Sequence, residues 1–303
     1  MKFGVNILNF GPGTTPDSLV QQALDAKELG YSFAMISDHV AVTADVHEAY
    51  PAPFFDQFVL AAHLAGRVPG LTLGTTVTVI PYRHPLHTAR LAANIDCLNP
   101  GGFILGAGTG WSRAEYAALG VPFTERGRIA DEYLAAIRAA WTEDPTTFRG
   151  EYVSYEDVHT APAPQSRPGL PVWVGGNSPA ALRRAARLGE GWHPYLATLP
   201  AMRAALPVLA EEAERAGRAA PALVPRLQIR VTGTVIDGEH PVGHGTLDQI
   251  REDLVALADL GATHLLLDTA PDSPARRGTA EEDRRLLELL TEKVLDPVSG
   301  TIR

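Results

Sequence analysis

The chain alternates short apolar runs with segments of helical periodicity, and this alternation restricts its fold more than any other feature. Apolar runs of strand length occur at residues 3–8, 32–37, 71–80, 102–108, 171–176, 191–195, 226–235 and 264–269. In the segment after each run, apolar residues recur every three or four positions, as in an amphipathic helix. These segments are 15–30, 56–68, 84–99, 126–143, 178–189, 199–217, 247–261 and 281–295. Strands that alternate with helices of this length are joined by crossovers and lie parallel.

Eight strand–helix units in 303 residues are typical of an α/β protein with a (β/α)8 TIM-barrel fold. An open, doubly wound sheet shows the same alternation. Its dinucleotide fingerprint, G-x-G-x-x-G after the first strand, is absent from this sequence. The nearest match, "GAGTGW" at 106–111, follows the fourth strand and leads into a loop. We therefore predict a closed barrel that forms one domain over residues 1–303.

Three segments are expected to define the substrate. Residues 144–170 are proline-rich, with alternating aromatics and a turn at Gly150, which predicts a hairpin followed by an extended stretch. Residues 237–246 form a loop rich in glycine and histidine after the seventh strand, and residues 40–55 carry several aromatics. Because long loops on the C-terminal face of a barrel are often functional, we predict insertions on that face.

Composition argues against several classes of function. The net charge is −9 and no block of like charges stands out, so we expect no nucleic-acid partner. No apolar run approaches the length of a membrane span, and the N-terminus has no signal-peptide pattern. The only cysteine, Cys97, has no partner for an internal disulfide, and the histidines are scattered without metal-binding spacing. We expect a cytoplasmic protein without a metal site.

The strand ends offer candidate site residues, each with an ordinary structural explanation. Asp38 and His39 end the second strand and suggest a proton-transfer or orienting pair, or else a capped surface loop. The threonines of the third strand offer hydroxyl groups to a ligand but are also good strand formers. Arg83 lies in the loop that follows. Gly106 and Gly108 allow close approach to the fourth strand's backbone, which alone is a weak signal.

A stronger signal is the Gly175-Gly176 pair at the end of the fifth strand, just before a helix that starts near Ser178. Free N–H groups and the positive end of the helix dipole make such a terminus an anion site. A capped turn followed by a solvated arginine face is the alternative. We favour a phosphate site.

Several motifs together resemble the bacterial luciferase-like monooxygenase superfamily, most closely its branch that uses the deazaflavin coenzyme F420. They are "ISDHV", "PYRHP", "LGAGTGW...EY..LGVPF.ERG...DEYL.AIR..W", "F.GEY" and "P.PVWVGGNSPAALRRAARLGEGW". The resemblance extends over nearly the whole chain. It implies a barrel with a flavin or deazaflavin at its C-terminal mouth.

The resemblance also implies roles for individual residues. His39, with Asp38 beside it, would lie near the reactive face of the ring. Thr76-Val77 matches the position where relatives have a non-prolyl cis peptide behind the ring. The remaining cofactor contacts would come from Gly106 and Gly108 at the ring edge, Gly175, Gly176, Asn177 and Ser178 at the phosphate, and Arg83 at the tail. Thr109 stands where some deazaflavin dehydrogenases of the family have a glutamate, so a sugar-phosphate dehydrogenase is not expected.

The expected function is therefore an F420-dependent oxidoreductase that transfers a hydride to or from a small organic substrate, with His39 exchanging the proton. An FMN-dependent monooxygenase fed by a separate reductase is the first alternative. A flavin-binding protein without turnover is the second. Relatives are often dimers, so a homodimer is expected.

Overall fold

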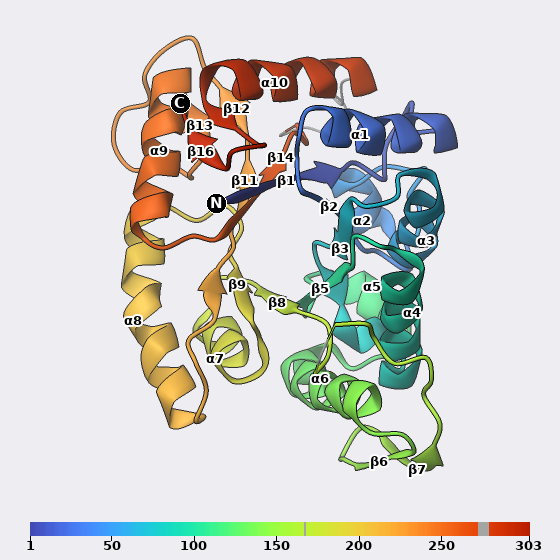
Figure 1. Ribbon diagram of the computed structural model, residues 1–303. Coiled ribbons are helices and arrows are strands. Elements are labelled where there is room, and N and C mark those ends of the chain that lie inside the picture. Colours follow the sequence, from blue (N-terminus) through green and yellow to red (C-terminus); the bar gives the residue numbers. More distant parts are fainter. Residues whose placement is uncertain (167, 272–278) are drawn as a thin grey trace.

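The computed structural model describes residues 1–166, 168–271 and 279–303. Its centre is a barrel of parallel strands, most of which pair with the next strand along the chain (Figure 1). The strands are β1 (Lys2–Ile7), β2 (Phe33–Ile36), β3 (Thr72–Thr75), β5 (Phe103–Gly108), β8 (Val172–Gly175), β9 (Gly191–His193), β10 (Ala222–Leu223), β11 (Arg226–Gln228) and β14 (His264–Asp268).

A single bent strand closes the barrel. β10 pairs with β9 and β11 pairs with β14, and only Val224 and Pro225 separate β10 from β11. The Val224 N–H donates to the Trp192 carbonyl at 2.9 Å, and the Leu266 N–H donates to the Pro225 carbonyl at 3.0 Å. Residues 222–228 thus act as one strand with a neighbour on each side, which gives the eight strands of a TIM barrel.

One long helix follows each barrel strand, and these helices surround the sheet (Figure 1). They are α1 (Pro16–Glu28), α3 (Gln57–Arg67), α4 (Pro85–Leu98), α6 (Arg126–Thr142), α7 (Pro179–Leu188), α8 (Leu199–Arg215), α9 (Leu247–Asp259) and α10 (Ala280–Lys293). Two shorter helices, α2 (Ala44–Ala49) and α5 (Arg113–Ala118), lie in the connections after β2 and β5. No helix among the described residues is both long and apolar enough to cross a membrane.

The apolar core has two layers because side chains alternate across a strand. In β14, Leu266 belongs to a small cluster inside the barrel, whereas Leu265 and Leu267 belong to the large cluster beneath the helices. The inner cluster also contains Phe33, Met35, Ile104, Trp173 and Val224. These bulky side chains fill the barrel and leave its C-terminal mouth to the polar residues at the strand ends.

The seventh strand differs from the prediction. A single strand was expected over residues 226–235, but it begins at Ala222, bends at Pro225 and leaves the barrel after Gln228. Pro225 has no N–H to donate to a sheet, which favours a bend there. The chain continues as β12 (Arg230–Val231), which pairs with β13 (His244–Gly245) outside the barrel.

The hairpin within residues 144–170 consists of β6 (Thr146–Arg149) and β7 (Ser154–Val158), paired antiparallel. Its turn is bound to α6, because the Glu132 carboxylate accepts hydrogen bonds from the N–H groups of residues 151–153. The hairpin connects α6 to β8 and lies outside the ring of helices (Figure 1). None of its described residues lines the cavity at the barrel mouth, and the part expected of this segment in defining the substrate stays a prediction.

Candidate active site

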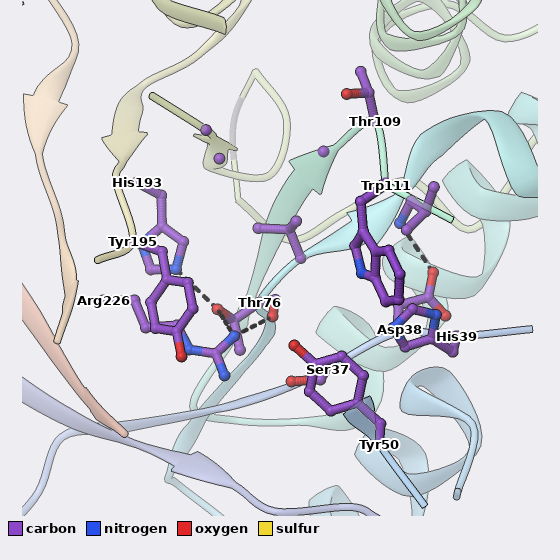
Figure 2. Close-up of a pocket in the computed structure, with 16 residues that line it drawn as sticks. Ser37, Asp38, His39, Tyr50, Thr76, Thr109, Trp111, His193, Tyr195 and Arg226 are labelled. Atoms are coloured by element: carbon purple, nitrogen blue, oxygen red, sulfur yellow. Dashed lines mark hydrogen bonds between the residues drawn. The ribbon is translucent and has the colours of Figure 1, made fainter. Parts of the chain in front are cut away.

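A cavity of about 320 Å³ lies at the carboxyl ends of the barrel strands. Residues from β2, β3, β5, β8, β9 and β11 or the loops after them line it. Figure 2 shows two groups of side chains facing each other across it. We call His39, Tyr50 and Trp111 the aromatic wall, and His193, Tyr195 and Arg226 the arginine wall.

The aromatic wall is built around His39, which follows β2. The centroid of its ring lies 5.2 Å from that of Tyr50 and 5.9 Å from that of Trp111. Phe54 makes an edge contact with His39 at 5.4 Å, so aromatic rings surround the imidazole. Trp111 keeps 47% of its surface exposed at the mouth. An apolar ligand therefore has a flat surface to contact on this side of the cavity.

Behind this wall, Glu115 of α5 holds His39 in one orientation. Its Oε2 lies 2.7 Å from Nδ1 of His39 and accepts a bond from the Tyr82 hydroxyl at 3.0 Å. Its Oε1 accepts from the N–H groups of Val40 and Ala41 at 2.7 and 3.0 Å. Since an ionised carboxylate only accepts, the ring proton is on Nδ1, and Nε2 is left for a ligand.

Glu115 is fully buried, and burial by itself opposes ionisation. The hydrogen bond and charge of His39 and the two backbone N–H groups outweigh that effect and lower the pKa of Glu115. Burial and the neighbouring Glu115 carboxylate raise the pKa of Tyr82, so this hydroxyl stays protonated and donates. A fixed negative charge therefore stands behind His39.

Asp38 lines the cavity, but its carboxylate is engaged by Arg83. The two η-nitrogens of Arg83 each donate to one Asp38 oxygen at 2.8 Å, and the Val79 N–H donates to Oδ2 at 2.9 Å. Arg83 also binds Asp56 at 3.0 Å and lies outside the cavity lining. This geometry makes Asp38 and Arg83 a pair that joins the loops after β2 and β3. The contact of Arg83 with a cofactor tail stays a prediction.

The arginine wall depends on a buried ion pair. Arg226 donates through Nε and Nη2 to Oδ2 of Asp268 at 3.0 and 2.7 Å. Its Nη1 donates to the carbonyl of Thr76 at 2.9 Å, and its guanidinium lies 4.6 Å from the Tyr195 ring centroid. Burial disfavours the cation, but Asp268 reverses that effect and raises the pKa of Arg226. The charge on this wall is therefore permanent and internally balanced.

His193 belongs to the same network but is electrostatically different from His39. Burial lowers its pKa to about 4, and the positive charge of Arg226 acts in the same direction. Its Nδ1 bonds to the Val224 carbonyl, which only accepts, so Nδ1 carries the proton. Nε2 then accepts from the Thr76 hydroxyl at 2.9 Å (Figure 2). Both ring nitrogens are thus occupied.

Thr76 and Val77 form the surface between the walls, and the peptide bond that joins them is cis. Glycines make room for Val77 on both sides. A Cβ on Gly108 would lie 2.5 Å from Val77, and one on Gly175 would lie 3.1 Å from it. Gly106 is needed for another reason. A Cβ at this position would lie 1.8 Å from the Thr75 carbonyl oxygen, so the glycine permits the two strands to pack. Gly106 does not line the cavity.

The N-terminus of α7 adjoins the cavity through Gly175 and Gly176, and Gly176 has a φ of 112° that glycine adopts readily. Ser178 caps the helix by accepting from the Ala181 N–H. The Asn177 amide donates to the Tyr195 carbonyl at 2.7 Å. Asn177 and Ser178 lie outside the cavity lining, beside the part that the two glycines form.

Sequence reasoning missed Glu115 and the whole arginine wall. Glu115 was visible only as the glutamate of the "GTGW...EY" motif, without a partner. His193 and Tyr195 lay in the recognised strand 191–195 but were not singled out. Among the described residues, no group of three or more histidine, cysteine, aspartate or glutamate side chains is arranged to hold a metal ion.

Comparison with known proteins adds named relatives. An F420-dependent glucose-6-phosphate dehydrogenase from Kineococcus radiotolerans is 33% identical over 221 residues, which cover 69% of this chain and 60% of that protein. An uncharacterized protein of Mycobacterium tuberculosis is 34% identical over 179 residues, which cover 55% of this chain and 61% of the relative. The chain thus spans about three fifths of the length of these relatives.

Solved structures share the fold at low identity. An F420-dependent secondary alcohol dehydrogenase in complex with an F420-acetone adduct has a TM-score of 0.77 at 15% identity and covers 98% of both chains. A monooxygenase from Streptomyces bottropensis has a TM-score of 0.75 at 19% identity, covering 97% of this chain and 98% of the other. A model of the family described as luciferase-like monooxygenase matches residues 1–241. The chain belongs to the luciferase-like monooxygenase family.

Proposed function

We propose that the chain is a coenzyme F420-dependent oxidoreductase that transfers a hydride to or from a small organic substrate. The observation that carries the proposal is the His39–Glu115 pair, which presents one ring nitrogen to a cavity whose walls suit a flat cofactor and an organic ligand. Relatives named F420-dependent, at 28–35% identity, support the choice of cofactor.

The residues at the mouth fit a deazaflavin. The cavity volume falls within the range of small-molecule sites, about 300–1,000 Å³. Thr76 and Val77 offer one face to a ring, and Gly108 leaves room at its edge. The buried Ser37 hydroxyl lines the cavity and has no hydrogen-bond partner among the residues that the structure describes, so it is available to a polar ring atom.

A phosphate on the cofactor would bind at the start of α7, against Gly175, Gly176, Asn177 and Ser178. The first-turn N–H groups of a helix and its dipole favour an anion there. The bound deazaflavin supplies the hydride chemistry.

The protein's own part is to orient the reactants and to move one proton. His39 exchanges this proton with the substrate through Nε2, while Nδ1 remains hydrogen-bonded to Glu115. The Glu115 carboxylate stabilises the positive charge that the ring acquires. Asp38 keeps its charge in the pair with Arg83 and holds the loop that carries His39. His193 holds the Thr76 side-chain hydroxyl and does not exchange the proton, because both of its nitrogens are occupied.

The cytoplasmic location and a homodimeric state are part of the same proposal. FMN is the alternative cofactor, and with it the enzyme would be a monooxygenase that needs a separate reductase. A protein that binds either cofactor without turnover is the remaining alternative.

Titration of the purified protein with oxidised F420, and in parallel with FMN, separates these alternatives. We expect a dissociation constant in the micromolar range or below for F420 and a much weaker one for FMN. The reverse preference would contradict the proposed cofactor. Matched titrations of Ser37→Ala and Gly176→Val are expected to weaken F420 binding, through a lost hydrogen bond and a blocked phosphate site respectively.

A further inference from the structure

We infer that the substrate of this site is a small, uncharged and largely apolar molecule that lies against Trp111 and Tyr50 with its single polar atom at Nε2 of His39. The inference rests on the proposed function, because it concerns the substrate half of the same cavity. It specifies the class of molecule, which neither the family nor the fold determines.

The charges in the cavity lining are balanced within the protein. Of the sixteen residues that line it, all within the described part of the chain, only Asp38 and Arg226 carry a permanent charge. Asp38 is neutralised by Arg83 through two hydrogen bonds, and Arg226 by Asp268 through two more. Each charge has its partner behind the wall, so the lining offers no unpaired cation to an anionic substrate.

An anionic substrate would be costly to place in this cavity. Desolvating a phosphate or carboxylate is expensive unless an opposite charge or several donors compensate it. On the aromatic wall, the charge behind His39 is the buried Glu115 carboxylate, which repels an anion. For the cofactor phosphate, the N–H donors at the start of α7, beside the cavity, compensate the cost of desolvation.

The aromatic wall suits a ligand with an apolar carbon skeleton. Tyr50 and Trp111 flank His39, and Phe10 and Phe54 pack behind Tyr50 and His39. Rings around one imidazole bury the carbon skeleton of a ligand, and this wall offers only a few hydrogen-bonding atoms, namely Nε2 of His39, the Tyr50 hydroxyl and the Trp111 N–H. A ligand rich in hydroxyl groups would leave most of them without partners, which disfavours it strongly.

The deciding experiment compares two ligands that share a six-membered carbon ring and differ in charge. Calorimetry measures the affinity of cyclohexanone and of cyclohexanecarboxylate for the F420-loaded enzyme, with glucose 6-phosphate as a second anion. We expect cyclohexanone to bind at least about tenfold more tightly than either anion. Equal or tighter binding of an anion would overturn the inference.

Variants test the apolar contact and the effect of charge separately. Trp111→Ala is expected to weaken cyclohexanone binding about tenfold, and Trp111→Phe to restore most of it. Val59→Ala, at a residue of α3 that is 71% exposed and outside the cavity, is the matched control and should change nothing. Thr109→Lys adds an unpaired cation to the lining and should shift the ratio of affinities towards the anion about tenfold. An unchanged ratio in Thr109→Lys would contradict the electrostatic argument.

Failure of the proposed function can be told apart from failure of the inferred substrate class. If neither F420 nor FMN binds, the proposed function is wrong, and the same ligand pair is then measured on the unloaded protein. A preference for cyclohexanone there would still support an uncharged ligand, whereas a preference for the carboxylate would overturn it.

Discussion

The two histidines that face each other across the cavity, His39 and His193, differ in what lies behind them. His39 has a buried carboxylate on Nδ1 and an open Nε2. His193 has a backbone carbonyl on Nδ1, a threonine hydroxyl on Nε2 and a guanidinium nearby, and its pKa is lowered to about 4. Because the second nitrogen and the partner's charge decide whether an imidazole can gain a proton, two histidines of one cavity acquire different tasks.

The same contrast holds for the two walls as wholes. The arginine wall is a closed network from Asp268 through Arg226 and Thr76 to His193, in which almost every polar atom has a partner. The aromatic wall leaves Nε2 of His39 and the rings of Tyr50 and Trp111 available to a ligand. A closed network fixes geometry, whereas an open one leaves interactions for a ligand. We therefore assign cofactor support to the arginine wall and substrate chemistry to the aromatic wall.

The largest expected effect separates the two histidines directly. His39→Asn removes the proton-exchanging group and should lower kcat with F420 by about 10²- to 10⁴-fold, with little change in F420 affinity. His193→Asn should lower kcat less than about tenfold, because that side chain exchanges no proton in our proposal. The measurement is steady-state kinetics with a parallel F420 titration. If the two variants lost the same activity, the division of tasks between the walls would be wrong.

A second test uses pH and stability instead of activity. His193 has a pKa near 4 when folded and about 6.5 when unfolded. As pH falls below 6.5, the unfolded chain binds a proton that the folded chain does not, so the free energy of unfolding decreases. The decrease continues until about pH 4, below which both states are protonated. Between pH 7 and 4.5, the titration of His193 alone should lower the free energy of unfolding by about 2–3 kcal/mol.

Urea unfolding at these two pH values, followed by circular dichroism, measures that cost. His193→Asn does not titrate, so its stability should fall by about 2–3 kcal/mol less than that of the wild type over the same interval. His264, whose pKa is also lowered to about 4 by burial and by Lys2, contributes equally to both proteins and cancels. Parallel losses in the two proteins would show that His193 is not buried in the neutral form.

The sequence predicted the barrel and the aromatic wall's histidine for the same physical reason. Strand–helix alternation is a local pattern, and a residue at a strand's carboxyl end is placed at the mouth as soon as the barrel is recognised. His39 at the end of β2 and the two glycines at the end of β8 were found in this way. Their roles stay predictions, since the geometry gives their positions only.

Arg226 of the arginine wall escaped because the register of its strand depends on a bend that the apolar pattern does not reveal. With the seventh strand expected over residues 226–235, Arg226 would start the strand and lie at the opposite end of the barrel. The strand begins at Ala222, which moves Arg226 to the mouth. Glu115 escaped for another reason: it lies on a six-residue helix in a loop, 76 positions from His39, and only folding brings the two together.

The smallest predicted effect tests whether the charge behind His39 matters or only its hydrogen bond. Glu115→Gln keeps a similar shape but replaces the carboxylate with a neutral amide. The amide has one accepting oxygen, whereas the four donors around Glu115 are now bound by two. We expect kcat to fall by about 10- to 100-fold, since loss of a buried partner of this kind has such effects. The pH–rate profile should move towards lower pH, because the protonated ring loses a stabilising charge. Tyr82→Phe removes a single donor to the same carboxylate and is the matched control, with an expected change below about threefold. A Glu115→Gln variant with an unshifted profile would mean that Glu115 orients the ring without tuning it, and the two histidines would then differ in access alone.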